Sequence, residues 1–229
     1  MKKFNFNEIE SSFYSIEQDG VRSFMIIGDY ILLIDSGRGG NNLLSQVRNY
    51  SDKPIKIVYT HADGDHTGDA HDFNDRYMHP SEFEYYYSKS SNPVPMNALW
   101  EGEVVKIKDF RFEVISIPGH TPGSIALLDR KKRILIGGDS LQPGPIYMFG
   151  PGRNFHAFKA SMIKLQKYLS EFDYIYASHH QLKVTSSIIS LLLKGAENMI
   201  AGKVEGEPEP RFEGKAKLYE TNGVSFFAK

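Results

Sequence analysis

A short apolar run that ends in a histidine- and aspartate-rich turn constrains the fold of this 229-residue chain more than any other feature. Residues 55–59 read Ile-Lys-Ile-Val-Tyr, which is typical of a buried strand. Residues 60–69 follow at once and read Thr-His-Ala-Asp-Gly-Asp-His-Thr-Gly-Asp. A tight turn at a strand end brings such imidazoles and carboxylates together at the edge of a sheet. Nitrogen and hard oxygen donors together suit Zn, Fe or Mn, whereas the simpler alternative is a polar loop without metal.

Composition limits the classes of partner. The chain is 41% hydrophobic and 24% charged with a net charge of −1, and its dispersed Lys and Arg residues form no footprint for nucleic acid. It has no cysteine, which excludes disulfides, thiolate metal sites and a Cys nucleophile, and fits a reducing compartment. No run approaches the ~20 apolar residues of a membrane span, and the residues after Met1-Lys2-Lys3 are not an apolar leader. We therefore expect a cytoplasmic protein with a small-molecule substrate, no nucleic acid or membrane partner, and an oligomeric state that the sequence leaves open.

The pattern of apolar runs predicts an α/β chain. A block of strands comes first, strands and helices then interleave, and sheet returns at the far end, with no linker of domain-boundary character, so we expect one domain over residues 1–229. The expected strands are 12–17, 22–27, 30–34, 55–59, 76–78, 103–107, 110–117, 124–128, 133–136 and 174–176, with a closing hairpin over 211–227. The expected helices are 41–50, 81–87, 155–169 and 186–200.

Further metal-binding residue types follow other expected strands. His120 comes after the strand that ends at Ile117, Asp139 follows 134–136, and the pair His179 and His180 follows 174–176. Because different strands deliver their end residues to one edge of a sheet, we expect these side chains to meet. Such a donor set suits a dinuclear hydrolytic centre, in which one carboxylate bridges two ions ~3.5–4 Å apart.

The chain resembles the metallo-β-lactamase superfamily of metallohydrolases. Five blocks in the right order carry the resemblance: Asp35, His61–His66, His120 in Gly-His-Thr-Pro-Gly-Ser, Asp139 in Gly-Gly-Asp-Ser, and His179 with His180. The resemblance covers essentially the whole chain and is specific for the superfamily, but it says little about substrate. It implies a four-layer αββα sandwich with the metals at one edge of two packed sheets, and hydrolysis by a metal-bound hydroxide.

The resemblance also implies a role for each residue. His61 and His120 correspond to ligands of a first metal site, Asp139 to a bridging ligand, and Asp65, His66 and a late His to ligands of a second site. For the late His we favour His179, because His180 stands where the family usually has Gly. Asp65 would also orient the attacking water and handle its proton. Asp35 would accept a hydrogen bond that fixes the site.

One position departs from the family signature His-x-His-x-Asp-His. Asp63 replaces the second His. If Asp63 binds, the first site gains a hard anionic donor that favours Fe or Mn more than imidazole does, while still accepting Zn. A Glu fills this position in the flavo-di-iron proteins of the superfamily. If Asp63 points away, the first site is weak or missing.

These observations define three hypotheses. The leading one is a metallohydrolase with two divalent ions, for which Zn is favoured over Fe or Mn. It would cleave a small ester, thioester or lactone-like substrate, because Gly-His-Thr-Pro-Gly-Ser resembles glyoxalase II-like members. The second is a di-iron redox protein of the same fold, and the third is a non-catalytic metal-binding module. The proline-stiffened run 142–149 suits either a lip that contacts substrate or a plain connecting loop.

Overall fold

The computed structural model describes residues 4–40 and 42–229, and the chain divides into two compact units, residues 1–114 and 115–229. Two compact units can still belong to one domain, so this division does not test the expectation of a single domain over residues 1–229, which stays a prediction. In the part of the chain that is described, no helix combines the length and apolar character needed to cross a membrane.

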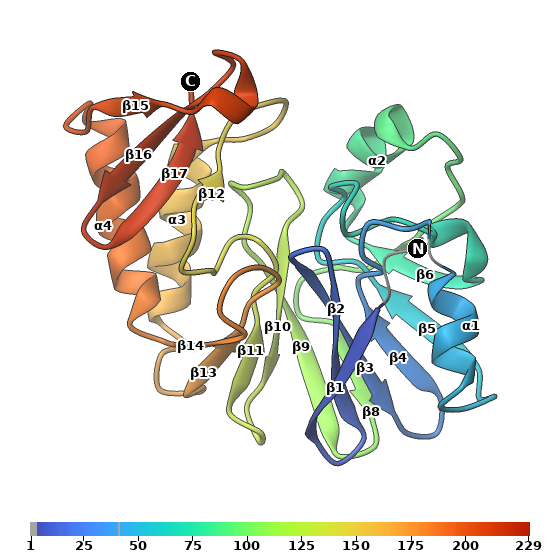
Figure 1. The fold of residues 1–229 in the computed structure, drawn as a ribbon. Coiled ribbons are helices and arrows are strands. Elements are labelled where there is room, and N and C mark those ends of the chain that lie inside the picture. Colours follow the sequence, from blue (N-terminus) through green and yellow to red (C-terminus); the bar gives the residue numbers. More distant parts are fainter. Residues whose placement is uncertain (1–3, 41) are drawn as a thin grey trace. The chain divides into compact units, whose positions relative to one another are not determined.

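The first unit is built on a seven-stranded sheet whose strands lie in chain order (Figure 1). The strands are β1 (Asn5–Glu10), β2 (Phe13–Gln18), β3 (Val21–Ile27), β4 (Ile31–Ile34), β5 (Ile55–Val58), β6 (Asp75–Met78) and β7 (Asn97–Ala98). Strands β1 to β4 pair antiparallel, and β4 to β7 pair parallel. The carboxyl ends of β4 and β5 therefore lie side by side at one edge of the sheet.

Short helices accompany this sheet, namely α1 (Leu43–Arg48), η1 (Ala70–Asp72), η2 (Pro80–Glu82) and α2 (Phe83–Lys89). Asn42 caps α1 by accepting a hydrogen bond from the Ser45 amide over 3.1 Å. Leu43 and Val47 are buried in one core cluster with strand residues such as Leu33. An antiparallel pair, β8 (Val104–Ile107) and β9 (Phe110–Ser116), follows α2.

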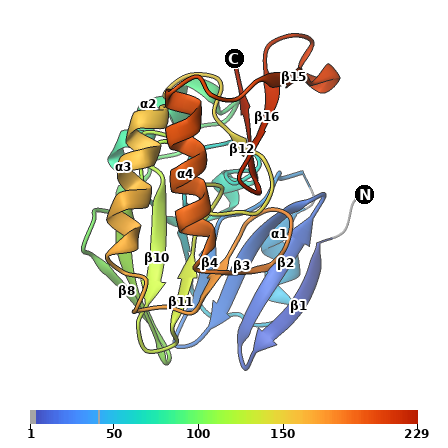
Figure 2. The same ribbon diagram turned by 90° about the vertical axis from the view of Figure 1, so that its left-hand side faces the viewer.

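The second unit contains two groups of strands and two long helices. In the first group, β10 (Ile125–Asp129) pairs antiparallel with β11 (Ile134–Ile136), β11 parallel with β13 (Tyr174–Tyr176), and β13 antiparallel with β14 (Lys183–Thr185). Helices α3 (Phe155–Gln166) and α4 (Ile188–Ile200) lie side by side (Figure 2). Phe158 of α3 and Leu192 of α4 are fully buried in one core cluster with Leu135 of β11.

The last sheet has the order β12–β17–β16–β15. Its strands are β12 (Ile146–Tyr147), β15 (Gly206–Pro208), β16 (Lys217–Thr221) and β17 (Val224–Ala228), and η3 (Pro210–Phe212) lies between β15 and β16. Gly195 lets α4 approach β17, because an added Cβ there would lie 2.7 Å from Cγ2 of Val224. Asn222-Gly223 forms the turn of the β16–β17 hairpin, with φ of 51° and 76°.

Most strands and all four helices form where the sequence predicts them, and the differences have physical causes. Five strands were not predicted. β1 is a mostly exposed edge strand with an irregular register near its end, so it lacks clean alternation. The others, β7, β12, β14 and β15, are only two or three residues long, too short for a periodic pattern, and β12 lies within the run 142–149 that was expected to be a lip or a loop. The closing hairpin begins at Lys217 rather than 211, because residues 210–212 form a 3₁₀ turn that Glu209 caps. The predicted helix 41–50 is shorter, at 43–48, and residue 41 lies outside the described residues.

Candidate metal centre

In the first unit, Asp35 and Thr60 join the ends of the parallel strands β4 and β5. The Asp35 amide donates to the Val58 carbonyl over 2.9 Å. Its carboxylate accepts two hydrogen bonds from Thr60, one from the amide and one from Oγ1, each over 2.7 Å. Asp35 is buried and has a positive φ of 62°, a conformation that a side chain other than Gly adopts only when its surroundings hold it there.

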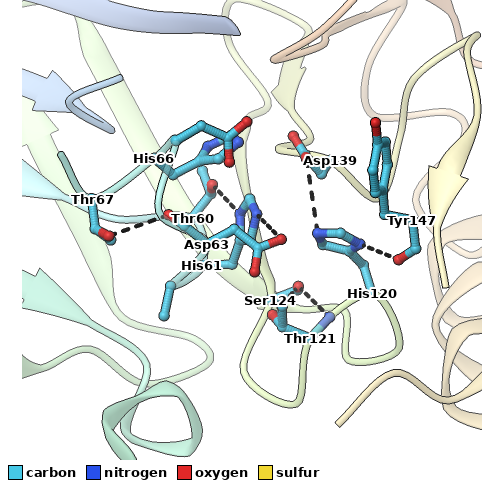
Figure 3. Close-up of polar contacts among 12 residues, drawn as sticks. Thr60, His61, Asp63, His66, Thr67, His120, Thr121, Ser124, Asp139 and Tyr147 are labelled. Carbon is cyan, nitrogen blue, oxygen red and sulfur yellow. Dashed lines mark hydrogen bonds and ion pairs between the residues drawn. The ribbon is translucent and has the colours of Figure 1, made fainter. Parts of the chain in front are cut away.

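The same network sets the protonation of two imidazole rings. His66 Nδ1 donates to Oδ2 of Asp35 over 2.8 Å, because a carboxylate can only accept. Thr60 Oγ1 uses its single proton toward Asp35, so its 3.0 Å contact with Nδ1 of His61 is a bond that His61 donates (Figure 3). Both rings are buried. In the neutral form of each ring Nε2 then carries the lone pair, which is the form that binds metals.

Two carboxylates follow on the same turn. Oδ2 of Asp63 lies 3.6 Å from Nε2 of His61, and Oδ1 accepts a hydrogen bond from the Tyr85 hydroxyl over 2.9 Å. Oδ2 of Asp65 lies 3.3 Å from a guanidinium nitrogen of Arg38. Ligand atoms of Asp65 and His66 are within 4.8 Å of one another. All four predicted metal-binding residues of this unit thus lie on a single turn.

The turn is anchored to the loop after β4. The Ser36 amide donates to the His66 carbonyl over 2.8 Å, and the Gly68 amide donates to the Gly37 carbonyl over 2.9 Å. A Cβ at Gly68 would lie 2.2 Å from the Arg38 carbonyl carbon, so the two loops pass too closely for any other residue. This contact holds the His- and Asp-bearing turn on the sheet edge.

In the second unit, His120 is held by β12. His120 Nδ1 donates to the Tyr147 carbonyl over 2.9 Å, so in the neutral ring the lone pair is again on Nε2. Nε2 lies 3.8 Å from Oδ2 of Asp139 (Figure 3). The preceding Gly119 has a φ of 144°, and a Cβ there would lie 2.4 Å from Cα of Phe158, so α3 packs directly behind this turn.

Asp139 faces a second imidazole. Asp139 follows β11 and His179 follows β13, its parallel neighbour. Oδ2 of Asp139 lies 3.3 Å from Nε2 of His179, so the same carboxylate oxygen is near both His120 and His179. His180 instead packs on Gly144, where an added Cβ would lie 2.0 Å from Nε2 of His180. His180 has a φ of 58°, a conformation that Gly adopts most easily.

The donor atoms fit divalent metal ions. Three pairs, His61–Asp63, His120–Asp139 and His179–Asp139, have separations of 3.6, 3.8 and 3.3 Å. Good hydrogen bonds between nitrogen and carboxylate oxygen are shorter, at about 2.7–2.9 Å. Two ligands at about 2.1 Å from one tetrahedral ion lie roughly 3.4 Å apart, which is close to these separations. Imidazole nitrogens beside carboxylate oxygens at these separations are thus a suitable donor set.

Three supporting residues were not predicted from the sequence. Thr60 holds His61, Tyr85 holds Asp63, and the carbonyl of Tyr147 holds His120. The position of Thr60 offered a sequence signal for its role, because its hydroxyl comes directly before the first His at the end of a strand. A backbone carbonyl such as that of Tyr147 leaves no trace in the residue types.

Comparison with known proteins identifies the class. Residues 17–179 match the model of the metallo-beta-lactamase superfamily, and the chain belongs to this superfamily. An uncharacterized protein of Aquifex aeolicus is 30% identical over 166 residues, which are 65% of this chain and 78% of that protein.

Two further relatives have assigned activities. A Gallus gallus protein named acyl-coenzyme A thioesterase MBLAC2 is 25% identical over 210 residues, covering 75% of this chain and 70% of that protein. A hydroxyacylglutathione hydrolase of Bdellovibrio bacteriovorus is 29% identical over 154 residues, which are 65% of this chain and 58% of that protein.

A solved structure shows the same fold. The metallo-beta-lactamase from Pontibacter korlensis superposes with a TM-score of 0.72 at 18% sequence identity, and the match covers 86% of this chain and all of that one. The predicted α/β, metallo-β-lactamase-like fold class is therefore confirmed.

Proposed function

We propose that this chain is a metallohydrolase whose ligands are His61, Asp63, Asp65, His66, His120, Asp139 and His179. The observation that carries the proposal is the orientation of three buried imidazoles, each of which donates from Nδ1 to an acceptor, so that Nε2 is the nitrogen left for a metal in the neutral ring. As the superfamily resemblance implies, we assign the seven residues to two divalent ions. We propose Zn as the preferred ion, followed by Mn or Fe. We further propose that residues 1–229 act as one domain, which calorimetry tests as a single cooperative transition.

The chemistry divides between the ions and the chain. Divalent ions supply Lewis acidity and lower the pKa of water toward neutrality when bound. We assign to Asp65 the orientation of the attacking water and the transfer of its proton, and Arg38, 3.3 Å away, limits where that carboxylate points. Hydrolysis adds water at the carbonyl carbon and breaks the bond to the leaving atom.

A thioester is the substrate class that we propose. One relative is named an acyl-coenzyme A thioesterase and another a hydroxyacylglutathione hydrolase, and an acylglutathione is a thioester. The Gly-His-Thr-Pro-Gly-Ser block around His120 also resembles glyoxalase II-like members. The second unit also has a cluster of partly exposed rings next to His120. Tyr147 stacks on Phe149 at 5.8 Å between centroids, and Phe212 lies 4.8 Å from Phe149. We propose that these rings contact the apolar acyl group.

Metal content and hydrolysis, measured together, test the proposal. Protein purified without chelator is analysed by inductively coupled plasma mass spectrometry and assayed on an acyl-coenzyme A, an acylglutathione, an oxygen ester and a phosphodiester. We expect two ions per chain and thioester cleavage that Asp139→Ala abolishes. Asp109→Asn, which changes an exposed carboxylate in a turn, is the control and should keep both the metal content and the thioester cleavage. Full hydrolysis and full metal content in Asp139→Ala would contradict the bridging role.

Asp63 supports a second candidate, a di-iron redox protein. Its carboxylate lies 3.6 Å from Nε2 of His61, and a carboxylate in place of imidazole makes the donor set harder and more negative. Two equivalents of Fe and no thioester cleavage would favour this candidate. Absence of both metal and cleavage would favour a non-catalytic module. The cytoplasmic location stays a prediction, to be checked by cell fractionation.

A further inference from the structure

The segment η2–α2 contacts the metal-binding turn at two successive residues. Oε2 of Glu82 accepts a hydrogen bond from the Ala62 amide over 2.7 Å, and Glu82 is fully buried. One helical turn later, the Tyr85 hydroxyl donates to Oδ1 of Asp63 over 2.9 Å. The backbone before Asp63 and the side chain of Asp63 are thus both held from the same side.

The two oxygens of Asp63 consequently have different surroundings. Oδ1 is engaged by Tyr85, whereas Oδ2 lies 3.6 Å from Nε2 of His61. We propose that Tyr85 is a positioning residue that fixes Asp63 as a metal ligand through Oδ2 alone. This inference rests on the proposed metallohydrolase function and explains how the chain uses Asp where its family has His.

A carboxylate needs such support more than an imidazole does. Asp63 can rotate its carboxylate and exchange one oxygen for two at the metal, and a hydrogen bond to Oδ1 removes that freedom. Supporting partners of this kind typically change metal affinity by about 10–100-fold when they are removed. Tyr85 therefore acts through Asp63 and not on the substrate.

The neighbouring tyrosines of α2 are used differently. The hydroxyl of Tyr86 accepts from the Val94 amide over 3.2 Å, and that of Tyr87 accepts from the Met96 amide over 3.3 Å. Both bonds stabilise the loop that follows α2. Tyr87→Phe is therefore a matched control, since it removes a hydroxyl from the same helix without touching the metal-binding turn.

A double-mutant cycle on metal affinity tests the inference. Zn²⁺ and Mn²⁺ affinities are measured by competition with a chromogenic chelator for wild type, Tyr85→Phe, Asp63→Asn, the double variant and Tyr87→Phe. We expect Tyr85→Phe to weaken binding at one site by about 10–100-fold and Tyr87→Phe to leave it unchanged. In the Asp63→Asn background, Tyr85→Phe should cause no further loss. The absorption spectrum of bound Co²⁺ should change in Tyr85→Phe and stay unchanged in Tyr87→Phe.

Any other outcome of the cycle overturns the role of Tyr85. The outcomes also distinguish failure of this role from failure of the proposed metallohydrolase function. Wild-type affinity in Tyr85→Phe, or an equal loss with and without Asp63, would show that Tyr85 does not act through Asp63. Wild-type affinity in Asp63→Asn would show that Asp63 is not a ligand, and it would leave a hydrolase built on the other donors intact. Failure of the wild-type protein to bind either ion would remove the metallohydrolase proposal itself. A general folding effect of Tyr85→Phe persists in the Asp63→Asn background, so the cycle detects it.

Discussion

His66 donates a hydrogen bond from Nδ1 to Oδ2 of Asp35 over 2.8 Å, and both side chains are buried. The same oxygen accepts a bond from Thr60 Oγ1, which in turn accepts one from His61. One carboxylate therefore determines the tautomer of both imidazoles on the turn. A carboxylate this deeply buried is stable only because its hydrogen bonds are made.

Asp35→Asn should disrupt both rings at once. The amide that replaces one oxygen can only donate, so it competes with a proton on His66 or on Thr60 for the same position. We expect metal affinity to fall by at least about 10-fold and the free energy of unfolding of the metal-free protein to fall by about 1–3 kcal/mol. Chelator competition and urea unfolding measure the two effects, and Asp109→Asn serves again as the control.

Thr60 offers a finer test, because its hydroxyl can be kept or removed. Thr60→Ser preserves the hydroxyl and should bind metal like the wild type. Thr60→Val removes the hydroxyl that lies between Nδ1 of His61 and Oδ2 of Asp35, while His66 still donates to that oxygen, and should weaken binding by about 10-fold or more. Equal affinities for the Val and Ser variants would show that His61 does not depend on this hydroxyl.

The pair His179 and His180 should respond in opposite ways to substitution. His179 lies 3.3 Å from Asp139, so His179→Ala should lower the metal content by one ion per chain. His180→Gly removes a side chain from a residue with a φ of 58° and should keep both ions, since Gly adopts this conformation without strain. Mass spectrometry of the two purified variants decides between them; retention of both ions in His179→Ala contradicts the assignment.

Removal of metal should lower the melting temperature. A ligand that binds only the folded state at 100 times its Kd adds about 2.7 kcal/mol. For a chain of this length, about 1 kcal/mol corresponds to roughly 2–4 °C in Tm. We therefore expect EDTA to lower Tm by roughly 5–10 °C per occupied site, and added Zn²⁺ or Mn²⁺ to restore it. Calorimetry that shows the same Tm with and without EDTA would argue against tightly bound ions.

The pKa of His79, the residue that precedes η2, should lie below its usual value of 6.5. Burial lowers the pKa of His79, although the charges of Glu82 and Glu101 act in the opposite direction. Its Nδ1 also accepts a bond from the Ser81 amide over 3.3 Å, which favours the neutral ring.

The sign for stability follows from this shift. Below pH 6.5 the unfolded chain binds more protons at His79 than the folded chain does, so stability falls as the pH falls through this value. NMR titration of the ring gives the pKa of His79. Urea unfolding at pH 7.5 and 5.5 should show a smaller loss for His79→Gln than for wild type.

The elements and the ligand residue types could be predicted from the sequence because both are local signals. An apolar run followed by His and Asp, as at residues 55–66, shows a strand and its end together. The role of Tyr85 could not be predicted, because it depends on a helix bringing a hydroxyl to a residue 22 positions earlier. The resemblance favours His179 over His180, whereas the residue types alone do not separate two adjacent histidines. Their different surroundings depend on a left-handed backbone at His180 and on the close packing of Gly144.

The turn between His61 and His66 is supported from two independent directions, by Asp35 on the strand side and by Tyr85 and Glu82 on the helix side. A change in the strand-side network reaches two of the proposed ligands, His61 and His66, together, whereas a change at Tyr85 reaches only Asp63. We therefore expect substitutions on α2 to change the metal preference through Asp63 while the Asp35 network stays intact, which makes α2 the better starting point for engineering that preference.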